Sequence, residues 1–290
     1  MVVFVGGSPG QDFAETIARG ARQAAEDLDV DLRLEWSDWD NERMLVQFKQ
    51  AVAERPDGIA IMGHPGESAL APLVAEARRK GVLVTSLNVD LPAIQQRYGA
   101  EGFGYVGQRM ARSGHSLAVA CIRMFELKPG DRVLLTGVKQ YPIRGERTSS
   151  AEDALVEAGV TVDYLQDDGD LKALEAAVVA HLRGHPEIVT VVDDADAAFM
   201  GGVLKRNNFD PDCYRVAGFD LSPDALALLR NGYLDLIADQ QPWLQGYLAV
   251  WQLAMSHRFG FTGLGVDTGS GFIHSGNLAQ VERLVAEGVR

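Results

Sequence analysis

Polar side chains able to bind a hydroxylated ligand gather just before residue 242 of the chain. Asp239, Gln240 and Gln241 follow the short apolar run 234–238, and Pro242 comes directly after them. The run is typical of a buried strand, and proline is favoured in the first turn of a helix. Carboxylate and amide groups therefore stand where a strand passes into a helix, which is where open α/β sheets bind ligands. An ordinary polar loop after a strand would have the same pattern.

Residues of the same kinds follow most of the other expected strands. The candidate ligand-binding residues are Gln11, Asp12, Phe13, Trp39, His64, Asn88, Asp90, Tyr141, Arg147, Asp194, Asp196, Asp220 and Gln240. Some of these positions also have a purely structural interpretation. Asp196 can cap the helix that follows it, His64 can be an ordinary loop residue, and Trp39 is undecided between the two roles.

The set suits a neutral ligand that carries many hydroxyl groups. Carboxylates accept hydrogen bonds from hydroxyls, arginine donates them in a fork, and amides do both. An aromatic ring adds a flat apolar face for C–H groups. A handful of desolvated charge-assisted bonds, at roughly 1.5–3 kcal/mol each, is enough for micromolar affinity. Arg147 stands near the start of an expected helix, where a cation is unfavourable, so a nearby acceptor would explain its place.

Catalytic and cofactor motifs are weak. Residues 6–10 match the Gly-x-Ser-x-Gly nucleophile elbow around Ser8. The residue after the serine must offer a backbone N–H to the oxyanion, but it is Pro9 and has none. An enzyme that uses Ser8 or a strand-end carboxylate is therefore the least favoured function. The chain has neither a dinucleotide-binding glycine fingerprint nor a phosphate-binding loop, so no cofactor is expected.

No metal site is expected either. The six histidines are scattered, and we expect no pair among them to have metal-ligand spacing on a helix. The acidic residues Asp167, Asp168 and Asp170 are better explained as a solvated loop before a helix than as calcium ligands. Cys121 and Cys213 allow at most one disulfide, and both are expected to be free, buried thiols.

The composition is that of a folded, acidic protein. The chain has 290 residues, of which 47% are hydrophobic and 23% charged, with a formal net charge of −13. That charge repels phosphate backbones, so nucleic acid is not an expected partner. No apolar run reaches the length of a membrane span, and no signal peptide precedes the strand that begins at Val2. Either the protein is cytoplasmic, or an export signal has been removed and Met1 stands at the junction.

Strands and helices alternate along the chain in two similar series. Apolar runs predict strands at 2–6, 30–36, 57–62 and 82–87 and, after a short glycine-rich segment at 102–107, at 132–136, 160–165, 188–192, 215–219 and 234–238. Stretches between them predict helices, for example at 12–28, 147–158 and 171–182. This order is typical of βαβ units, and we expect an α/β fold of two doubly wound, Rossmann-like lobes with parallel central sheets. The two lobes are completed by the last part of the chain, which is expected to form a long helix, a loop at 260–270, a short strand at 271–274 and a helix at 278–287.

Several short segments carry a resemblance to a known family. They are Gln-Asp-Phe at 11–13, Val-Thr-Ser-Leu-Asn at 84–88, Tyr-Val-Gly-Gln at 105–108, Val-Ala-Gly-Phe-Asp at 216–220 and Asp-Gln-Gln-Pro-Trp-Leu-Gln-Gly-Tyr at 239–247. The chain resembles the periplasmic sugar-binding proteins of bacterial ABC transporters, of the ribose-binding type. The resemblance implies a type I periplasmic binding fold, with two lobes joined by a three-strand hinge around a ligand cleft. It places 1–106 and 241–272 in the N-terminal lobe, and 107–240 and 273–290 in the C-terminal lobe.

The resemblance also implies roles for particular residues. Gln11 and Phe13 match the amide and the stacking ring of the family's first loop. Arg147 matches the arginine of the second lobe. Asp220 and Gln240 match a ligand-binding aspartate and the hinge glutamine.

The chain departs from the family's pentose-binding pattern at several positions. Asn88 replaces an aspartate, and Val89 stands where an arginine is common, so Asp90 can supply part of that pair. Asp194 can compensate for a missing asparagine, and Tyr141 can supply the ring of the second lobe. These changes favour another pentose, a hexose or an alditol over ribose.

The resemblance implies a monomeric, extracytoplasmic substrate-binding protein without catalytic activity. It would bind a monosaccharide or sugar alcohol and deliver it to the permease of an ABC importer. The alternative is the effector-binding domain of a LacI-type sugar-responsive repressor that lacks its DNA-binding segment. A helix-turn-helix ahead of Val2 would support the repressor, and a signal peptide there would support the transport protein. The net charge of −13 favours the transport protein.

Overall fold

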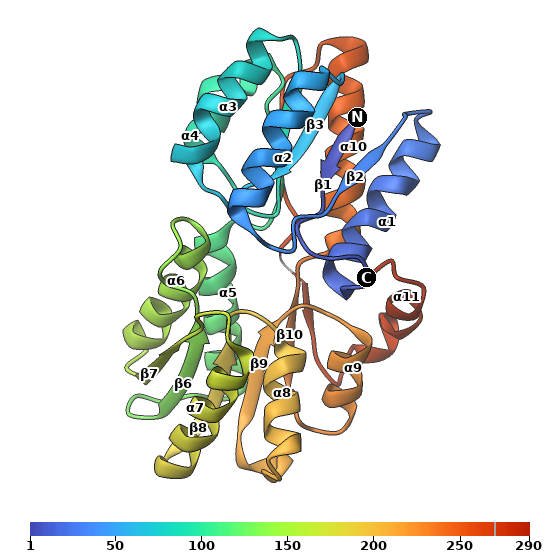
Figure 1. Cartoon of the computed structure of the whole chain (residues 1–290). Coiled ribbons are helices and arrows are strands. Elements are labelled where there is room, and N and C mark those ends of the chain that lie inside the picture. The colour runs from blue at the N-terminus through green and yellow to red at the C-terminus, as the bar shows by residue number, and fades with distance from the viewer. Residues whose placement is uncertain (270) are drawn as a thin grey trace. The chain divides into compact units, whose positions relative to one another are not determined.

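The computed structural model describes residues 1–269 and 271–290, and the chain divides into two compact units (Figure 1). Unit 1 comprises Met1–Arg109, Gln241–Thr268 and Glu287–Arg290, and unit 2 comprises Met110–Gln240 and Gly269–Ala286. The lobes expected from the sequence differ at the edges. The first crossing follows Arg109 instead of residue 106, the third follows Thr268 instead of residue 272, and 287–290 lie with unit 1.

Unit 1 contains a parallel sheet with the strand order β11-β5-β4-β3-β1-β2. Its strands are β1 (Val2–Phe4), β2 (Arg33–Glu35), β3 (Gly58–Met62), β4 (Leu83–Leu87), β5 (Tyr105–Gly107) and β11 (Gly265–Asp267). Its helices are α1 (Asp12–Asp27), α2 (Asn41–Glu54), α3 (Glu67–Arg79), α4 (Pro92–Tyr98) and α10 (Pro242–Phe259), with a short 3₁₀ turn, η1, at Gly99–Glu101. This is the doubly wound arrangement that alternating strands and helices predict.

The helices α1 and α10 pack closely because each has a glycine where they cross. A Cβ atom on Gly20 would lie 1.9 Å from the carbonyl oxygen of Trp243, and one on Gly246 would lie 2.0 Å from that of Ile17. Only a residue without a Cβ allows the two backbones to approach this far. The crossing fixes the first turns of α10, including Gln245, within unit 1.

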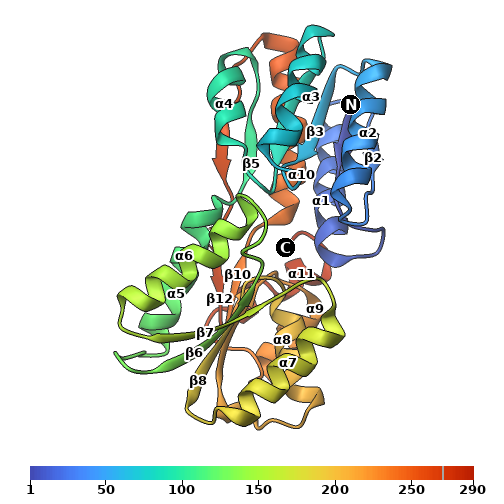
Figure 2. The same ribbon diagram turned by 60° about the vertical axis from the view of Figure 1, so that its left-hand side comes forward.

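Unit 2 contains a second sheet with the strand order β12-β10-β9-β8-β6-β7 (Figure 2). Its strands are β6 (Arg132–Gly137), β7 (Thr161–Gln166), β8 (Ile188–Asp193), β9 (Arg215–Phe219), β10 (Leu236–Asp239) and β12 (Gly271–Ile273). Its helices are α5 (Met110–Met124), α6 (Arg144–Glu157), α7 (Leu171–Gly184), α8 (Ala197–Arg206), α9 (Pro223–Arg230) and α11 (Glu282–Ala286), with 3₁₀ turns η2 (Pro211–Cys213) and η3 (Leu278–Gln280).

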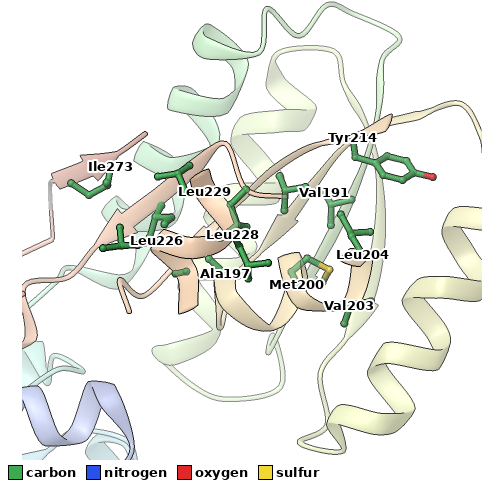
Figure 3. Close-up of a cluster of buried hydrophobic side chains, with 14 of the residues drawn as sticks. Val191, Ala197, Met200, Val203, Leu204, Tyr214, Leu226, Leu228, Leu229 and Ile273 are labelled. Atoms are coloured by element: carbon green, nitrogen blue, oxygen red, sulfur yellow. The ribbon is translucent and has the colours of Figure 1, made fainter. Parts of the chain in front are cut away.

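Both faces of this second sheet are covered by apolar side chains. Val191 belongs to a cluster with residues of α8 and α9, which Figure 3 shows, and the next residue, Val192, belongs to a cluster with residues of α5 and α6. Successive strand residues point to opposite faces, so a strand buried on both sides must be apolar at every position. Each fully buried Leu, Val or Met contributes roughly 1.5–3 kcal/mol, which makes these clusters the main source of stability.

The structure corrects several expectations. β12 is antiparallel to β10, because the chain leaves unit 2 after β10 and returns to the same edge in the opposite direction. The expected loop 260–270 contains the strand β11, while residue 270 lies outside the described part. The helix α4 was not predicted, and the closing helix is interrupted between η3 and α11.

Two further findings concern the cysteines and the membrane. Cys121 is buried, but Cys213 is exposed in the turn η2, so the expectation of two buried thiols is wrong for Cys213. Within the described residues, no helix combines the length and apolarity needed to cross a bilayer.

Candidate functional site

An aromatic group lies at the carboxyl ends of the first strands in unit 1. The indole ring of Trp39 lies 6.2 Å from the ring of Phe13 and 5.4 Å from that of His64, centroid to centroid. The side-chain oxygen of Gln11 accepts hydrogen bonds from Trp39 Nε1, at 2.9 Å, and from the backbone N–H of Ser8, at 3.0 Å. Three loops, after β1, β2 and β3, thus bring Gln11, Phe13, Trp39 and His64 together.

The orientation of Trp39 depends on an unusual backbone and on the glycine at position 6. Asp38 and Trp39 both have positive φ, of 53° and 59°, a conformation that L-residues adopt only where the surroundings enforce it. The Trp39 N–H donates to Gly6 O at 3.1 Å. A Cβ atom on Gly6 would lie 2.5 Å from the indole ring, so only glycine leaves room for it. Since Trp39 is 38% exposed, its ring forms part of the surface and not of the core.

Ser8 has a structural partner. Its hydroxyl donates to Asp38, whose carboxylate is also paired with Arg43. The hydrogen bond from Ser8 and the Arg43 charge lower the pKa of Asp38, so this carboxylate is a stable acceptor and a weak base. The carboxylate of Asp12 is exposed at the start of α1 and makes no hydrogen bond with the described residues.

Asn88 and Asp90 follow β4 and are held by residues that the sequence analysis did not single out. Asn88 is 6% exposed, has a positive φ of 65°, and donates from Nδ2 to Gln245 Oε1 at 3.2 Å. Asp90 accepts from Arg109 at 3.0 Å. Arg109 therefore supplies an arginine beside Asp90, although Val89 occupies the expected position. Gln245 lies in the quoted segment 239–247, and Arg109 directly follows the segment 105–108, so both could have been found there.

Arg147 and Asp194 form the centre of a second group, in unit 2. Nε of Arg147 donates to Asp194 Oδ1 at 2.6 Å, and its Nη2 donates to the Asp194 backbone oxygen. Arg144 and Thr148 donate to the second carboxylate oxygen. Burial opposes ionisation of Asp194, but Arg144, Arg147 and Thr148 outweigh it and lower its pKa. Asp194 is thus the nearby hydrogen-bond acceptor that we expected from the position of Arg147 near the start of a helix.

The position of Arg147 follows from the packing of α6. This helix begins at Arg144, after Ile143 with a φ of 62°, and not at 147 as predicted, so Arg147 lies one turn inside it. A Cβ atom on Gly114 of α5 would lie 1.9 Å from Arg147 O, which shows how closely the two helices approach. The guanidinium lies 3.8 Å from the ring centre of Phe219, within range of a cation–π contact.

Asp220 and Gln240 are joined at the ends of β9 and β10. Gln240 Nε2 donates to Asp220 Oδ1, while Asp220 Oδ2 accepts nothing from the described residues. Asp220 has a positive φ of 73° and is partly buried. Burial raises its pKa to about 7 against the opposing effect of the Arg147 charge. A carboxylate in this state readily accepts a hydrogen bond that replaces lost water.

Three further acidic or aromatic residues lie apart from the hydrogen bonds that hold Arg147. Asp193 is buried and accepts from Thr136 at 2.8 Å, and burial raises its pKa to about 7. Asp196 caps α8 by accepting from the Ala198 N–H at 2.9 Å. Tyr141 is 45% exposed, and no hydrogen bond or ring contact joins it to the Arg147 group among the described residues.

One group of side chains with the spacing of metal ligands corrects the sequence analysis. Asp163, His181 and His185 each offer a ligand atom within 4.8 Å of the other two. The statement that no histidine pair has metal-ligand spacing is therefore wrong, since His181 and His185 are four residues apart at the end of α7.

The fold and these groups define a class of α/β protein: two doubly wound units with polar and aromatic side chains at the carboxyl ends of their strands. The chain belongs to the periplasmic binding protein family, because the family model of the periplasmic binding protein domain matches residues 2–257. The resemblance inferred from the sequence segments is thereby confirmed.

Known proteins extend this likeness. The chain is 25% identical over 253 residues to the xylose/arabinose-binding protein XylF of Sulfolobus acidocaldarius; the match covers 82% of this chain and 62% of that protein. The chain thus spans less than two thirds of this curated relative. A carbohydrate transporter from Acidothermus cellulolyticus, solved in complex with myo-inositol, gives a TM-score of 0.82 at 25% identity, covering 100% of this chain and 98% of that one. A candidate LacI transcriptional regulator from Bacteroides fragilis gives a TM-score of 0.79 at 14% identity, covering 96% and 97%, which shows the fold alone.

Proposed function

We propose that the chain is the extracytoplasmic substrate-binding protein of an ABC importer and binds one pentose or cyclic polyol with side chains of both units. The main observation in support is that each unit has its own set of side chains able to bind a hydroxylated ligand. These side chains lie at the carboxyl ends of its strands. In unit 1 these are Gln11, Phe13, Trp39, His64, Asn88 and Asp90. In unit 2 they are Arg147, Asp220 and Gln240, with Asp194 as the residue that positions Arg147.

The chemistry of the two sets is complementary. The half-exposed ring of Trp39, supported by Phe13 and His64, offers a flat surface for the C–H face of a sugar ring. In unit 2, Asp220 Oδ2 is an acceptor for a hydroxyl, and Arg147 Nη1 donates to none of the described residues. A ligand with hydroxyls around a ring would satisfy both ends at once.

Closure would follow from this division of contacts. The chain passes between the units after Arg109, Gln240, Thr268 and Ala286. A ligand that is bound by both units stabilises only the arrangement in which both reach it, so its binding energy selects that arrangement. The permease of the importer would then recognise the closed form.

The names of the relatives narrow the ligand class. One is a xylose/arabinose-binding protein, and the other was solved with myo-inositol. Pentoses and inositol carry a hydroxyl on nearly every ring carbon and no charge. Asn88, in place of an aspartate, can both donate to and accept from a ligand hydroxyl.

A thermal-shift and calorimetry series over xylose, both arabinose enantiomers, ribose, glucose, myo-inositol and glycerol tests the proposal. At least one pentose or cyclic polyol should bind with a Kd of micromolar order, and a hundredfold excess over Kd should add about 2.7 kcal/mol of stability. Glycerol should have no effect. If none of the sugars or polyols stabilises the protein, the proposal is wrong.

A further inference from the structure

A half-buried cluster of metal-ligand side chains lies in unit 2, away from the strand-end residues described above. Asp163 is on β7, which is the edge strand of its sheet, and His181 and His185 are in the last turn of α7 and directly after it. One ligand atom of each residue lies within 4.8 Å of the others. None of the three belongs to the Arg147 or Trp39 groups.

We propose that Asp163, His181 and His185 bind one divalent transition-metal ion of the zinc type. Imidazole nitrogens with one carboxylate oxygen are a common ligand set for zinc and its first-row neighbours, whereas calcium and magnesium prefer oxygen ligands alone. Three protein ligands leave a fourth tetrahedral position for water or a small exogenous ligand.

For His181 and Asp163, binding an ion requires only a small movement. His181 Nε2 and Asp163 Oδ2 are 2.6 Å apart and share a hydrogen bond, and the rings of His181 and His185 lie 4.5 Å apart, centroid to centroid. Ligand atoms around tetrahedral zinc are roughly 3.3 Å apart, given bonds of about 2.0–2.1 Å. The ion would replace the shared proton, and the two side chains would separate by less than about 1 Å.

The surrounding charges favour a cation. Arg132 donates from Nε to both oxygens of Asp163, at 3.0 and 2.9 Å, and from Nη1 to Glu187 at 2.7 Å. Glu187 also lies 3.1 Å from Nδ1 of His185. Two carboxylates thus face one guanidinium, and the C-terminal end of α7 adds a partial negative charge. Before an ion binds, Asp163, Glu187 and Arg132 together carry a formal charge of −1, which attracts a cation.

Asp163 is suited to remain an ionised ligand. Burial opposes its ionisation, but the hydrogen bonds from Arg132 and His181 outweigh this and lower its pKa. Metal binding would join the edge strand β7 to the end of α7, and binding to the folded state alone would stabilise unit 2.

The test uses untagged, chelator-treated protein titrated with Zn²⁺ by calorimetry and with Co²⁺ by visible absorption, in the presence of excess Mg²⁺. We expect one saturable Zn²⁺ site and the ligand-field bands of Co²⁺ bound to nitrogen. Lowering the pH should weaken binding, because metal ions bind deprotonated imidazole nitrogens. The variants His181→Gln and His185→Gln should each weaken binding by at least about tenfold.

The matched control is His115→Gln, which removes an exposed histidine of α5 and should leave binding unchanged. His185→Gln decides the question if His181→Gln folds poorly, because the His185 side chain is 38% exposed and its replacement should disturb the fold less. Absence of saturable Zn²⁺ binding in the parent protein overturns the proposal. Equal losses in His185→Gln and His115→Gln also overturn it.

Discussion

Arg147 and Asp194 form a buried ion pair in unit 2: the arginine Nε donates to the aspartate Oδ1 across 2.6 Å, and the side chains are 3% and 2% exposed. Burying two charges costs several kcal/mol for each, which only good geometry and further hydrogen bonds offset. Arg144 and Thr148 provide these bonds to the other oxygen of Asp194. The pair holds Arg147 in one orientation, so we infer that Asp194 acts on a ligand through Arg147 and not by contact.

Replacing Asp194 by alanine should lower the free energy of unfolding by about 3–5 kcal/mol, because two guanidinium groups lose their carboxylate partner in a buried place. Chemical denaturation followed by circular dichroism measures this loss. The control is Glu282→Ala, whose pair with Arg230 is 38% and 51% exposed and should contribute less than about 1 kcal/mol. If both variants lose the same free energy of unfolding, burial does not explain the contribution of the Arg147–Asp194 pair.

Trp39 should contribute to sugar affinity in two separable ways. Trp39→Ala removes the flat ring and should weaken binding by about 2 kcal/mol or more, whereas Trp39→Phe keeps a ring but leaves Gln11 without the indole N–H and should cost about 1 kcal/mol. Calorimetry with the best sugar of the panel gives both values. Trp243→Phe is the control, because Trp243 stacks on Tyr247, 4.9 Å away, within α10. If the Trp39→Ala variant binds the sugar as tightly as the parent protein, the Trp39 ring does not contribute to binding.

The sequence predicted the alternation of strands and helices well, because buried strands such as β8 are continuous apolar runs that need no partner to be recognised. It failed for β11, whose Gly-Val-Asp sequence becomes a strand only by pairing with β5, far away along the chain. It also failed for the direction of β12, which depends on where the chain re-enters unit 2. Such features follow from tertiary pairing and leave little local pattern.

The positions of the candidate site residues could be predicted from the sequence, but their hydrogen-bond partners could not. Strand ends pointed to Arg147, Asp194 and Asn88, since parallel strands bring their carboxyl ends to one edge. The pairing of Arg147 with Asp194, or of Asn88 with Gln245, needs coordinates. The histidine pair was missed because the expected helix ended at 182, although α7 continues to Gly184 with His185 as its cap.

Gly114 should be required for the close crossing of α5 and α6. A Cβ atom there would lie 1.9 Å from Arg147 O and 2.7 Å from Ser150 Oγ, so Gly114→Ala must push α6 outward and should cost about 1–3 kcal/mol of unfolding free energy. Because Arg147 moves with α6, sugar affinity should fall as well. Gly184→Ala is the control, since a Cβ at Gly184 meets nothing within 4 Å and should change stability by less than about 1 kcal/mol.

The raised pKa of Asp220 should make stability depend on pH with a definite sign. Burial raises this pKa to about 7, whereas an unfolded aspartate titrates near 3.9. Between these values the folded state binds more protons than the unfolded state, so the free energy of unfolding falls as the pH rises from about 4 to about 7. Asp193, with a pKa also raised by burial to about 7, contributes in the same direction.

Asp220→Asn isolates this contribution, because asparagine keeps the shape of the side chain and cannot ionise. The stability of the parent protein relative to the variant should be greater at about pH 5 than at about pH 8, by about 1 kcal/mol or more. Urea denaturation at both pH values measures the difference, and Asp224→Asn, at an exposed position in α9, controls for the loss of a carboxylate. A difference that is the same at both pH values, or that grows toward pH 8, would show that Asp220 is ionised throughout this range.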